Sequence, residues 1–226
     1  MIWDDTGFLL SKNKYNENSV IAEFYTLNHG KCSGIIYGGT SRKIKNYLQL
    51  GNKVFITFKS KNENKNGYFT IEIIEPISPL FFDNILKMSI ITSSVNLLHI
   101  LTPELQKNEK VFYLLSNLFD HLKKKDENII LQYIFWELDL LKEIGFDLNL
   151  TSEKLNIDNN ELVEIYLDNE KFKIPFFLID RNKDKINKES IFNSLIFIGE
   201  YLNKKILKPN SLIYPKTRIN LQNLFR

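Results

Sequence analysis

The sequence predicts an α+β protein, because the two parts of the chain follow different hydrophobic periods. Residues 1–79 contain short runs rich in Val, Ile, Phe, Tyr and Thr between turn-forming residues, a pattern typical of β-strands. From Leu80 onward, apolar residues recur every three or four positions, which is typical of amphipathic helices. With 226 residues, 43% of them hydrophobic, the chain is long enough for one large or two small domains with a sizeable core.

Five strands are predicted in the first part of the chain. Turn-forming clusters such as Asn28-His29-Gly30 and Gly38-Gly39 separate them. Five short antiparallel strands in this length fit a small β-barrel of the OB type, so residues 1–79 are predicted to form an OB-fold domain that binds nucleic acid. The predicted strands are Gly7–Ser11, Ser19–Leu27, Lys31–Gly38, Asn52–Lys59 and Gly67–Glu75.

Three stripes of apolar residues predict core-facing helices in residues 80–226. Gly145 follows the second stripe as a C-terminal helix cap, and Pro209 stops the third just past its end. Residues 149–177 are polar and interrupted, so we expect an irregular insertion there, either a loop or a small β ribbon. The prediction is otherwise an all-helical C-terminal domain. The stripes are Val111, Leu115, Leu118 and Leu122; Ile130, Ile134, Leu138 and Leu141; and Ile191, Leu195, Ile198 and Leu202.

The segment from Lys31 to Gly67 has a one-sided charge. Eight cations and a single acid, Glu63, give it a net charge of +7, whereas the whole chain carries +3 and residues 79–226 carry no net charge. A compact basic surface with aromatic rings in it suits a polyanion with stackable bases, so nucleic acid is the first hypothesis for the ligand. The aromatic residues among these cations are Tyr37, Tyr47, Phe55 and Phe58.

Alternation along the fourth predicted strand places an aromatic ring between lysines. Lys53, Phe55, Thr57 and Lys59 share one face, and Val54, Ile56 and Phe58 share the other. If the second face lies in the barrel core, Phe55 lies outside the barrel. It then either stacks on bases or packs under a loop or the second domain, and the sequence leaves both open.

No catalytic machinery is recognisable, and the chain is predicted not to be an enzyme. The GxxxxGK, GxGxxG and GxSxG motifs are absent. Cys32 is the only cysteine, and His29, His99 and His121 have no His or Cys at metal-ligand spacing, so neither a disulfide nor a metal site is expected. No cofactor is expected either. The carboxylate pairs Glu137/Asp139 and Glu161/Glu164 are interpreted as solvated or ion-paired, and Asp4-Asp5 as the end of a strand.

A cytoplasmic, nucleoid-associated location is expected. The N-terminus is acidic and no apolar run follows it, unlike a secretory signal. The most apolar later stretches, Ile85–Leu101 and Ile191–Leu202, are interrupted by polar residues and fall short of the roughly 20 apolar residues that a membrane span needs.

A set of short motifs occurs in the same order and spacing as in one known family. The first part of the chain contains Trp3-x-Asp5-x-Gly7-x-x-Leu10, Glu23 to Thr26, His29-Gly30-Lys31, Gly38-Gly39-x-Ser41-Arg42-Lys43 and Leu48-Gln49-x-Gly51-Asn52. The later part contains Leu101-x-Pro103-Glu104, Trp136-Glu137-Leu138-x-Leu140-Leu141-x-x-x-Gly145-Phe146, and Leu202 to Pro209 with Pro215-x-x-Arg218. Together these motifs resemble the RecO family of bacterial recombination mediators.

The resemblance implies an N-terminal OB-fold, a helical C-terminal domain and a role in the RecFOR pathway of recombinational DNA repair. Proteins of this family bind single- and double-stranded DNA, anneal complementary strands, engage RecR and the tail of single-strand-binding protein (SSB), and help RecA load onto coated strands without hydrolysing nucleotides. Many members carry a four-cysteine zinc finger in the helical domain. The corresponding residues here, about 149–175, contain no cysteine, so the zinc is expected to be missing.

Charge and resemblance together select the candidate binding residues. Only 4 of the 30 basic residues are Arg, which disfavours readout of base edges and so disfavours sequence specificity. The loop from Gly38 to Lys45 resembles a basic element of the family. The predicted DNA contacts are Lys31, Arg42, Lys43 and Lys45, extended by Lys53, Lys59 and Lys61, with Phe55 and Tyr37 as stacking candidates.

The SSB tail, an acidic peptide ending in a hydrophobic residue, needs an apolar slot beside a cation. Two clusters are candidates: Leu114, Leu118 and Leu122 near Lys123, Lys124 and Lys125, or Lys216 and Arg218. Two other functions stay open, an OB-fold RNA-binding or translation accessory protein and a protein-binding scaffold.

Overall fold

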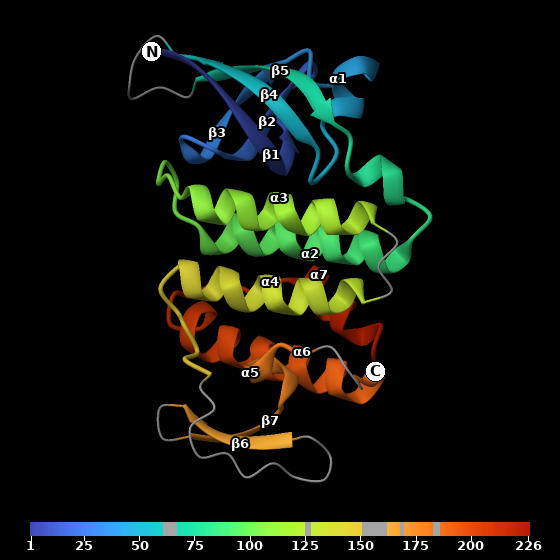
Figure 1. Ribbon diagram of the computed structural model, residues 1–226. Coiled ribbons are helices and arrows are strands. Elements are labelled where there is room, and N and C mark those ends of the chain that lie inside the picture. Colours follow the sequence, from blue (N-terminus) through green and yellow to red (C-terminus); the bar gives the residue numbers. More distant parts are fainter. Residues whose placement is uncertain (61–66, 125–127, 151–161, 168–169, 183–185) are drawn as a thin grey trace. The chain divides into compact units, whose positions relative to one another are not determined.

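The computed structural model describes residues 1–60, 67–124, 128–150, 162–167, 170–182 and 186–226 (Figure 1). The chain divides into two compact units, Met1–Phe119 and Asp120–Arg226. The first unit therefore includes the predicted strand region, residues 1–79, together with residues 80–119 of the predicted helical part. The sequence-based boundary after residue 79 marks the end of the strands and remains a prediction.

The first unit begins with five strands in the order of an OB-fold. They are β1 (Ile2–Lys14), β2 (Ser19–Thr26), β3 (Gly30–Tyr37), β4 (Lys53–Lys59) and β5 (Tyr68–Glu75). Neighbours follow the order β1-β2-β3-β5-β4, and β4 pairs with β1. β3 and β5 are joined by one parallel pair, Ile35 and Tyr68, so this side of the sheet is barely closed. The predicted fold class is confirmed, with a curled sheet in place of a fully closed barrel.

β1 is longer than predicted. The prediction started it at Gly7, but residues Ile2 to Thr6 pair with Lys59 to Phe55 of β4. The interpretation of Asp4-Asp5 as the end of a strand is therefore wrong. Both carboxylates are accommodated inside the strand because each has its own donor: Asp4 accepts from the Thr57 hydroxyl at 2.7 Å, and Asp5 accepts from groups of the β2–β3 turn.

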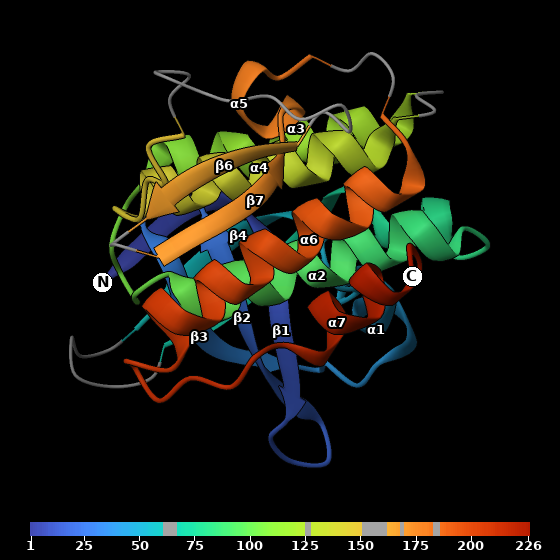
Figure 2. The ribbon, with the colours of Figure 1, turned by 90° about the horizontal axis from the view of Figure 1, so that it is seen from below.

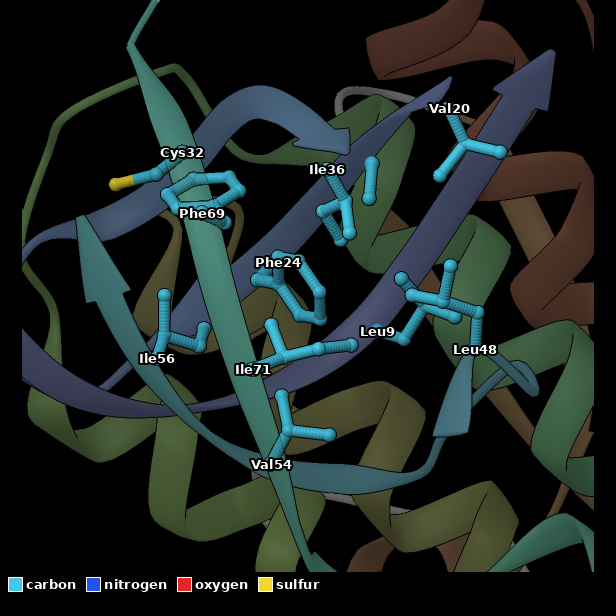
Figure 3. Close-up of a cluster of buried hydrophobic side chains, with 11 residues drawn as sticks. Leu9, Val20, Phe24, Cys32, Ile36, Leu48, Val54, Ile56, Phe69 and Ile71 are labelled. Atoms are coloured by element: carbon cyan, nitrogen blue, oxygen red, sulfur yellow. The ribbon is translucent and has the colours of Figure 1, made fainter. Parts of the chain in front are cut away.

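Alternating apolar residues of all five strands fill the interior of the curled sheet (Figure 3). Val54 and Ile56 of β4 are fully buried, as the period of two predicts. Phe58, on the same face, is only half-buried and packs against the edge of this core. The core members are Leu9, Val20, Ala22, Phe24, Cys32, Ile36, Leu48, Val54, Ile56, Phe69 and Ile71.

A short helix, α1 (Arg42–Tyr47), stands where the sequence predicted only a loop. The Ser41 hydroxyl caps it by accepting from the Ile44 N–H. Ile44 and Tyr47 pack against the barrel core on one side of the helix, and the buried Leu48 follows them. Arg42, Lys43 and Lys45 consequently lie on the opposite, exposed side of α1.

Two long helices complete the first unit, after a 3₁₀ turn η1 (Ser78–Phe81). They are α2 (Ile85–Leu101), capped by the Asn84 side chain, and α3 (Glu109–Lys123), which ends beyond the boundary between the units. The ring of Phe8 in β1 packs on Phe112 and Phe119 of α3, at 5.1 and 5.5 Å between centroids. Gly51 is required where the sheet meets α2: its φ is +79°, and a Cβ atom would lie 2.8 Å from Ile91.

The second unit combines helices with one two-stranded ribbon. The ribbon, β6 (Leu162–Leu167) and β7 (Glu170–Pro175), corresponds to the second of the two alternatives, a loop or a small β ribbon, that the sequence left open for 149–177, and it runs alongside α6 (Figure 2). Residues 151–161 lie outside the described residues. The helices are α4 (Ile129–Glu143), α5 (Phe177–Asp180), α6 (Lys188–Leu202), the π-helical turn η2 (Asn203–Leu207) and α7 (Lys216–Asn223). Within the described residues, no helix is both long and apolar enough to cross a membrane.

Candidate nucleic-acid interface

The exposed side of α1 gathers three of the predicted cations. Arg42, Lys43 and Lys45 are all exposed, and none has a carboxylate partner among the described residues. The turn before the helix depends on two glycines. Gly38 has a φ of +67°, and a Cβ atom on Gly39 would lie 2.5 Å from the Val20 side chain. The chain is therefore held close to β2 and presents α1 outward.

Lys12 of β1 joins this group, although the sequence did not indicate it. Its amine donates a hydrogen bond to the Leu48 carbonyl at the C-terminal end of α1, where the helix carries partial negative charge. Partial burial lowers the pKa of Lys12, and the neighbouring Lys45 cation lowers it further. Lys14, two residues on along the same strand, shares the face of Lys12. We call Lys12, Lys14, Arg42, Lys43 and Lys45 the basic corner.

A hydrogen-bonded contact joins the basic corner to the β1–β2 hairpin. The Thr40 hydroxyl donates to the Glu17 carbonyl, and lies 3.2 Å from both this oxygen and Asn18 Oδ1. The hairpin also exposes the ring of Tyr15. Glu17 is the acidic residue of the hairpin loop, residues 15–18, so the corner keeps a strong excess of positive charge.

Two exposed tyrosines lie where β3 and β5 meet. The Tyr37 side chain, a predicted stacking residue, is 65% exposed, and its ring centroid lies 6.0 Å from that of Tyr68. Lys59 is the cross-strand partner of Tyr68 and is also exposed. Tyr68 was missed by sequence reasoning, because a single Tyr at the start of a strand carries no pattern of its own.

Phe55 lies outside the barrel on the face of β4 that also carries Lys53 and Lys59, and two carboxylates lie near it. The side chain is 39% exposed, so the prediction of an outward position is confirmed. Its cross-strand partners are Thr6 of β1 and Glu72 of β5, and the exposed Asp4 accepts from Thr57 two residues along β4. A strand of nucleic acid would meet repulsion from these carboxylates here.

Lys31 and Lys53 are directed toward the helices of the first unit. The Lys31 amine donates to the His99 carbonyl at 2.8 Å, near the C-terminal end of α2. The Lys53 amine lies 5.6 Å from the ring centroid of Phe8 and 5.7 Å from that of Phe112. The structure thus separates these two lysines from the basic corner, and Lys61 lies outside the described residues.

The motif residues near the N-terminus form one hydrogen-bonded cluster. Asp5 accepts from the Asn28 N–H at 2.8 Å, and His29 Nδ1 lies 2.7 Å from the same carboxylate. The ring of Trp3 stacks on His29, with centroids 3.9 Å apart. This cluster stabilises the β2–β3 turn, so its role is structural.

Glu23 and Lys31 together tie three strands to α2. It lies 2.7 Å from His99 Nδ1 and accepts from the Ser11 hydroxyl at 2.8 Å. The hydrogen bond with His99 lowers the pKa of Glu23, against the effect of burial, and Ser11 and Lys31 lower it further. Because Lys31 also donates to the His99 carbonyl, β1, β2 and β3 are all linked to the end of this helix.

The described residues contain no group of three or more His, Cys, Asp and Glu side chains that could hold a metal. Cys32 is buried, and burial raises the pKa of its thiol to about 11. The thiol is therefore protonated at neutral pH, and a protonated thiol is a poor metal ligand.

Two family profiles match the chain in succession. The profile "Recombination protein O N terminal" matches residues 1–80, and "Recombination protein O C terminal" matches residues 83–163. The chain belongs to the RecO family. The RecO profiles divide the chain close to the end of β5.

Curated RecO proteins are similar over most of the chain. A DNA repair protein RecO of Cereibacter sphaeroides (strain ATCC 17029) is 34% identical over 151 residues, covering 67% of this chain and 62% of the relative. That of Roseobacter denitrificans is 28% identical over 165 residues, covering 73% and 68%. That of Rhodospirillum rubrum is 23% identical over 234 residues, covering 96% and 93%. The first match thus spans less than two thirds of its relative.

Burial and ion pairing occupy much of the first cluster predicted to bind the SSB tail. Leu118 and Leu122 are buried, the Lys123 amine pairs with Asp120 at 2.6 Å, and Lys125 lies outside the described residues. Lys124 is exposed, and Leu114 is half-buried. The buried leucines of this RecO-family chain therefore do not line an open slot.

Arg218 is not a surface cation, and this part of the prediction is wrong. Its side chain is 0% exposed and bonds the Glu137 carboxylate, because a buried guanidinium needs a partner of opposite charge. Burial acts to lower the pKa of Arg218, but Glu137, together with Tyr133 and Tyr214, raises it, and the net shift is upward, so the group stays charged. Lys216 is exposed instead, between Ile213 at 87% and Ile219 at 42% exposure. Residues 201–226 contain six cations and no acidic side chain.

Proposed function

We propose that this chain acts as a mediator of recombinational DNA repair. It binds single- and double-stranded DNA without sequence specificity, anneals complementary strands and, with RecR, assists RecA loading on SSB-coated DNA. Membership of the RecO family supports the repair role. The observation that carries the DNA-binding step is the basic corner, where exposed cations without carboxylate partners are presented on an OB-fold.

The basic corner lowers the barrier to annealing by electrostatics alone. Two strands repel each other through their phosphates, and cations that bind both strands release counterions and raise the local strand concentration. The exposed side of α1 supplies one Arg and two Lys close together, and Lys12 adds a fourth positive charge beside Lys45. No covalent bond changes in this mechanism, which is consistent with a protein that is not an enzyme.

We place the SSB-tail site near Lys216 in the second unit. The cation of Lys216 suits the acidic peptide, and the exposed side chains of Ile213 and Ile219 suit its terminal hydrophobic residue. Residues 201–226 contain no acidic side chain, so no side chain of this segment itself competes with the acidic peptide.

Strand annealing tests the function directly. Complementary oligonucleotides coated with SSB are mixed with the protein, with and without RecR, and duplex formation is followed by fluorescence. We expect faster annealing than without protein, a rate that falls steeply with salt, and a change on addition of RecR. A protein that binds no oligonucleotide at low salt, or binds tRNA far more tightly than single-stranded DNA, would contradict the proposal.

A further inference from the structure

Tyr37 and Tyr68 bring two exposed aromatic rings together on neighbouring strands. Their centroids are 6.0 Å apart and their planes are tilted by 59°, so neither ring covers the face of the other. Tyr37 is 65% exposed and Tyr68 is 37% exposed. Within the described part of the chain, neither hydroxyl has a hydrogen-bond partner. The two rings therefore lie side by side, and each has an exposed part of its surface.

The backbone beneath these rings is held close. A Cβ atom on Gly34 would lie 2.7 Å from the Phe69 ring, and one on Gly67 would lie 2.0 Å from the ring of Phe58. The absence of these Cβ atoms lets β3 and β5 approach each other and meet at Ile35 and Tyr68. The positions of both tyrosines are thus set by packed strands, which lowers the entropy cost of binding a ligand there.

Charge distinguishes this pair from the other exposed aromatic residue of the sheet. Tyr68 is the cross-strand partner of Lys59 in β4, and Tyr37 directly precedes the turn that leads to Arg42 and Lys43. Phe55 instead faces Glu72. A polyanionic strand is attracted to the tyrosines and repelled at Phe55.

We propose that Tyr37 and Tyr68 form a stacking platform for unpaired bases of a nucleic-acid strand whose phosphates lie on the basic corner. This inference rests on the proposed function and adds the binding mode at the same site. Stacking requires an exposed base face, which a single strand offers and the interior of a duplex does not. The platform therefore gives single strands an affinity that phosphate contacts alone do not provide.

The test compares three probes of equal length by fluorescence polarisation at fixed salt: labelled oligothymidylate, an abasic strand and a blunt duplex. We expect Tyr37→Ala and Tyr68→Ala each to weaken oligothymidylate binding by about 5- to 150-fold, the range for loss of one stacked base. Binding of the abasic strand and the duplex should change less than about twofold, since phosphate contacts remain. Tyr68→Phe should bind as the wild type does, because the ring is retained.

Tyr113→Ala is the matched control, since it removes an exposed ring of α3 that belongs to neither the platform nor the basic corner. The affinity of this variant for oligothymidylate should stay near wild type. Circular dichroism and melting of each variant establish that it is folded. Wild-type oligothymidylate affinity in both Tyr variants, or an equal loss on the abasic strand, would overturn the platform. If the Arg42→Ala/Lys43→Ala/Lys45→Ala variant then still weakens binding, the proposed function stands. A wild-type protein with no salt-dependent binding to any probe would overturn both.

Discussion

Arg218 and Glu137 form an ion pair in the interior of the second unit, although they are 81 residues apart in the chain. Arg218 Nε lies 2.9 and 3.1 Å from the two carboxylate oxygens, and Nη2 donates to the Leu195 carbonyl at 2.8 Å. One side chain thus connects α4, α6 and α7. Both partners belong to motifs that resemble the RecO family, which gives those motifs a structural meaning.

Removal of one partner of this pair should be strongly destabilising. Glu137→Ala leaves a buried guanidinium without its counter-charge, so we expect the free energy of unfolding to fall by roughly 3–5 kcal/mol. Urea denaturation measures it. Asp139→Asn is the matched control. Asp139 lies on the same helix as Glu137, and its substitution breaks a pair with the exposed Arg181 at the end of α5, so it should cost at most about 1 kcal/mol. Equal losses in the two variants would contradict this role of the buried pair.

The basic corner should dominate the salt dependence of DNA binding. If each cation of Arg42, Lys43 and Lys45 meets a phosphate, the triple change to Ala should reduce the salt slope on single strands by about 2. Each change should alter the stability by no more than about 0.5 kcal/mol, because the side chains are exposed. A control that removes Lys142, Lys173 and Lys188 of the second unit should leave the slope unchanged. An unaltered slope and annealing rate in the folded triple variant would exclude α1.

Protonation of the Glu23 carboxylate should account for part of the loss of folding stability in acid. Its pKa is lowered in the folded protein, so its contribution is full above the ordinary carboxyl pKa near 4.5 and is lost as the pH falls through that value toward the folded pKa. Glu23→Gln should therefore melt below wild type at neutral pH, and the difference should narrow at lower pH. Thermal melts over a pH series measure this, with the exposed Glu72→Gln as control. A difference that stays constant with pH would exclude this contribution.

Lys216 should matter for the SSB tail, whereas Lys124 should not. We expect Lys216→Ser combined with Ile213→Ser to weaken binding of the tail peptide at least about tenfold, or 1.4 kcal/mol, in calorimetry. Lys124→Ser, on an exposed position beside buried leucines, is the control. Unchanged affinity in the double variant would remove this site from the second unit's C-terminal segment.

No structural zinc is expected in this protein. Metal analysis of untagged protein should find far less than one zinc per chain, and the melting temperature should not respond to EDTA, since Cys32 is the only cysteine and is buried. Stoichiometric zinc would contradict this expectation and would show that His and carboxylate side chains form a site without a cysteine ligand.

The sequence predicted the fold well because the spacing of apolar residues distinguishes strands from helices. Alternation in runs such as Val54, Ile56 and Phe58 requires a strand with one buried face, and the stripe of Leu115, Leu118 and Leu122 requires a helix. Helix α1 was missed, since six residues complete fewer than two turns and show no repeat. Its formation depends on the Ser41 cap and on packing of Ile44 against the barrel.

The binding site was determined only in part by the sequence. The acid-poor segment indicated that residues 31–67 supply cations, and Arg42, Lys43 and Lys45 do lie exposed on one helix. Only the tertiary structure decided which other cations join them. It turned Lys31 and Lys53 toward the helices, brought Lys12 to the end of α1 and placed Tyr68 beside Tyr37. The physical reason is that charge and periodicity are properties of the local chain, whereas the direction of a side chain depends on strand pairing and packing between segments far apart in sequence.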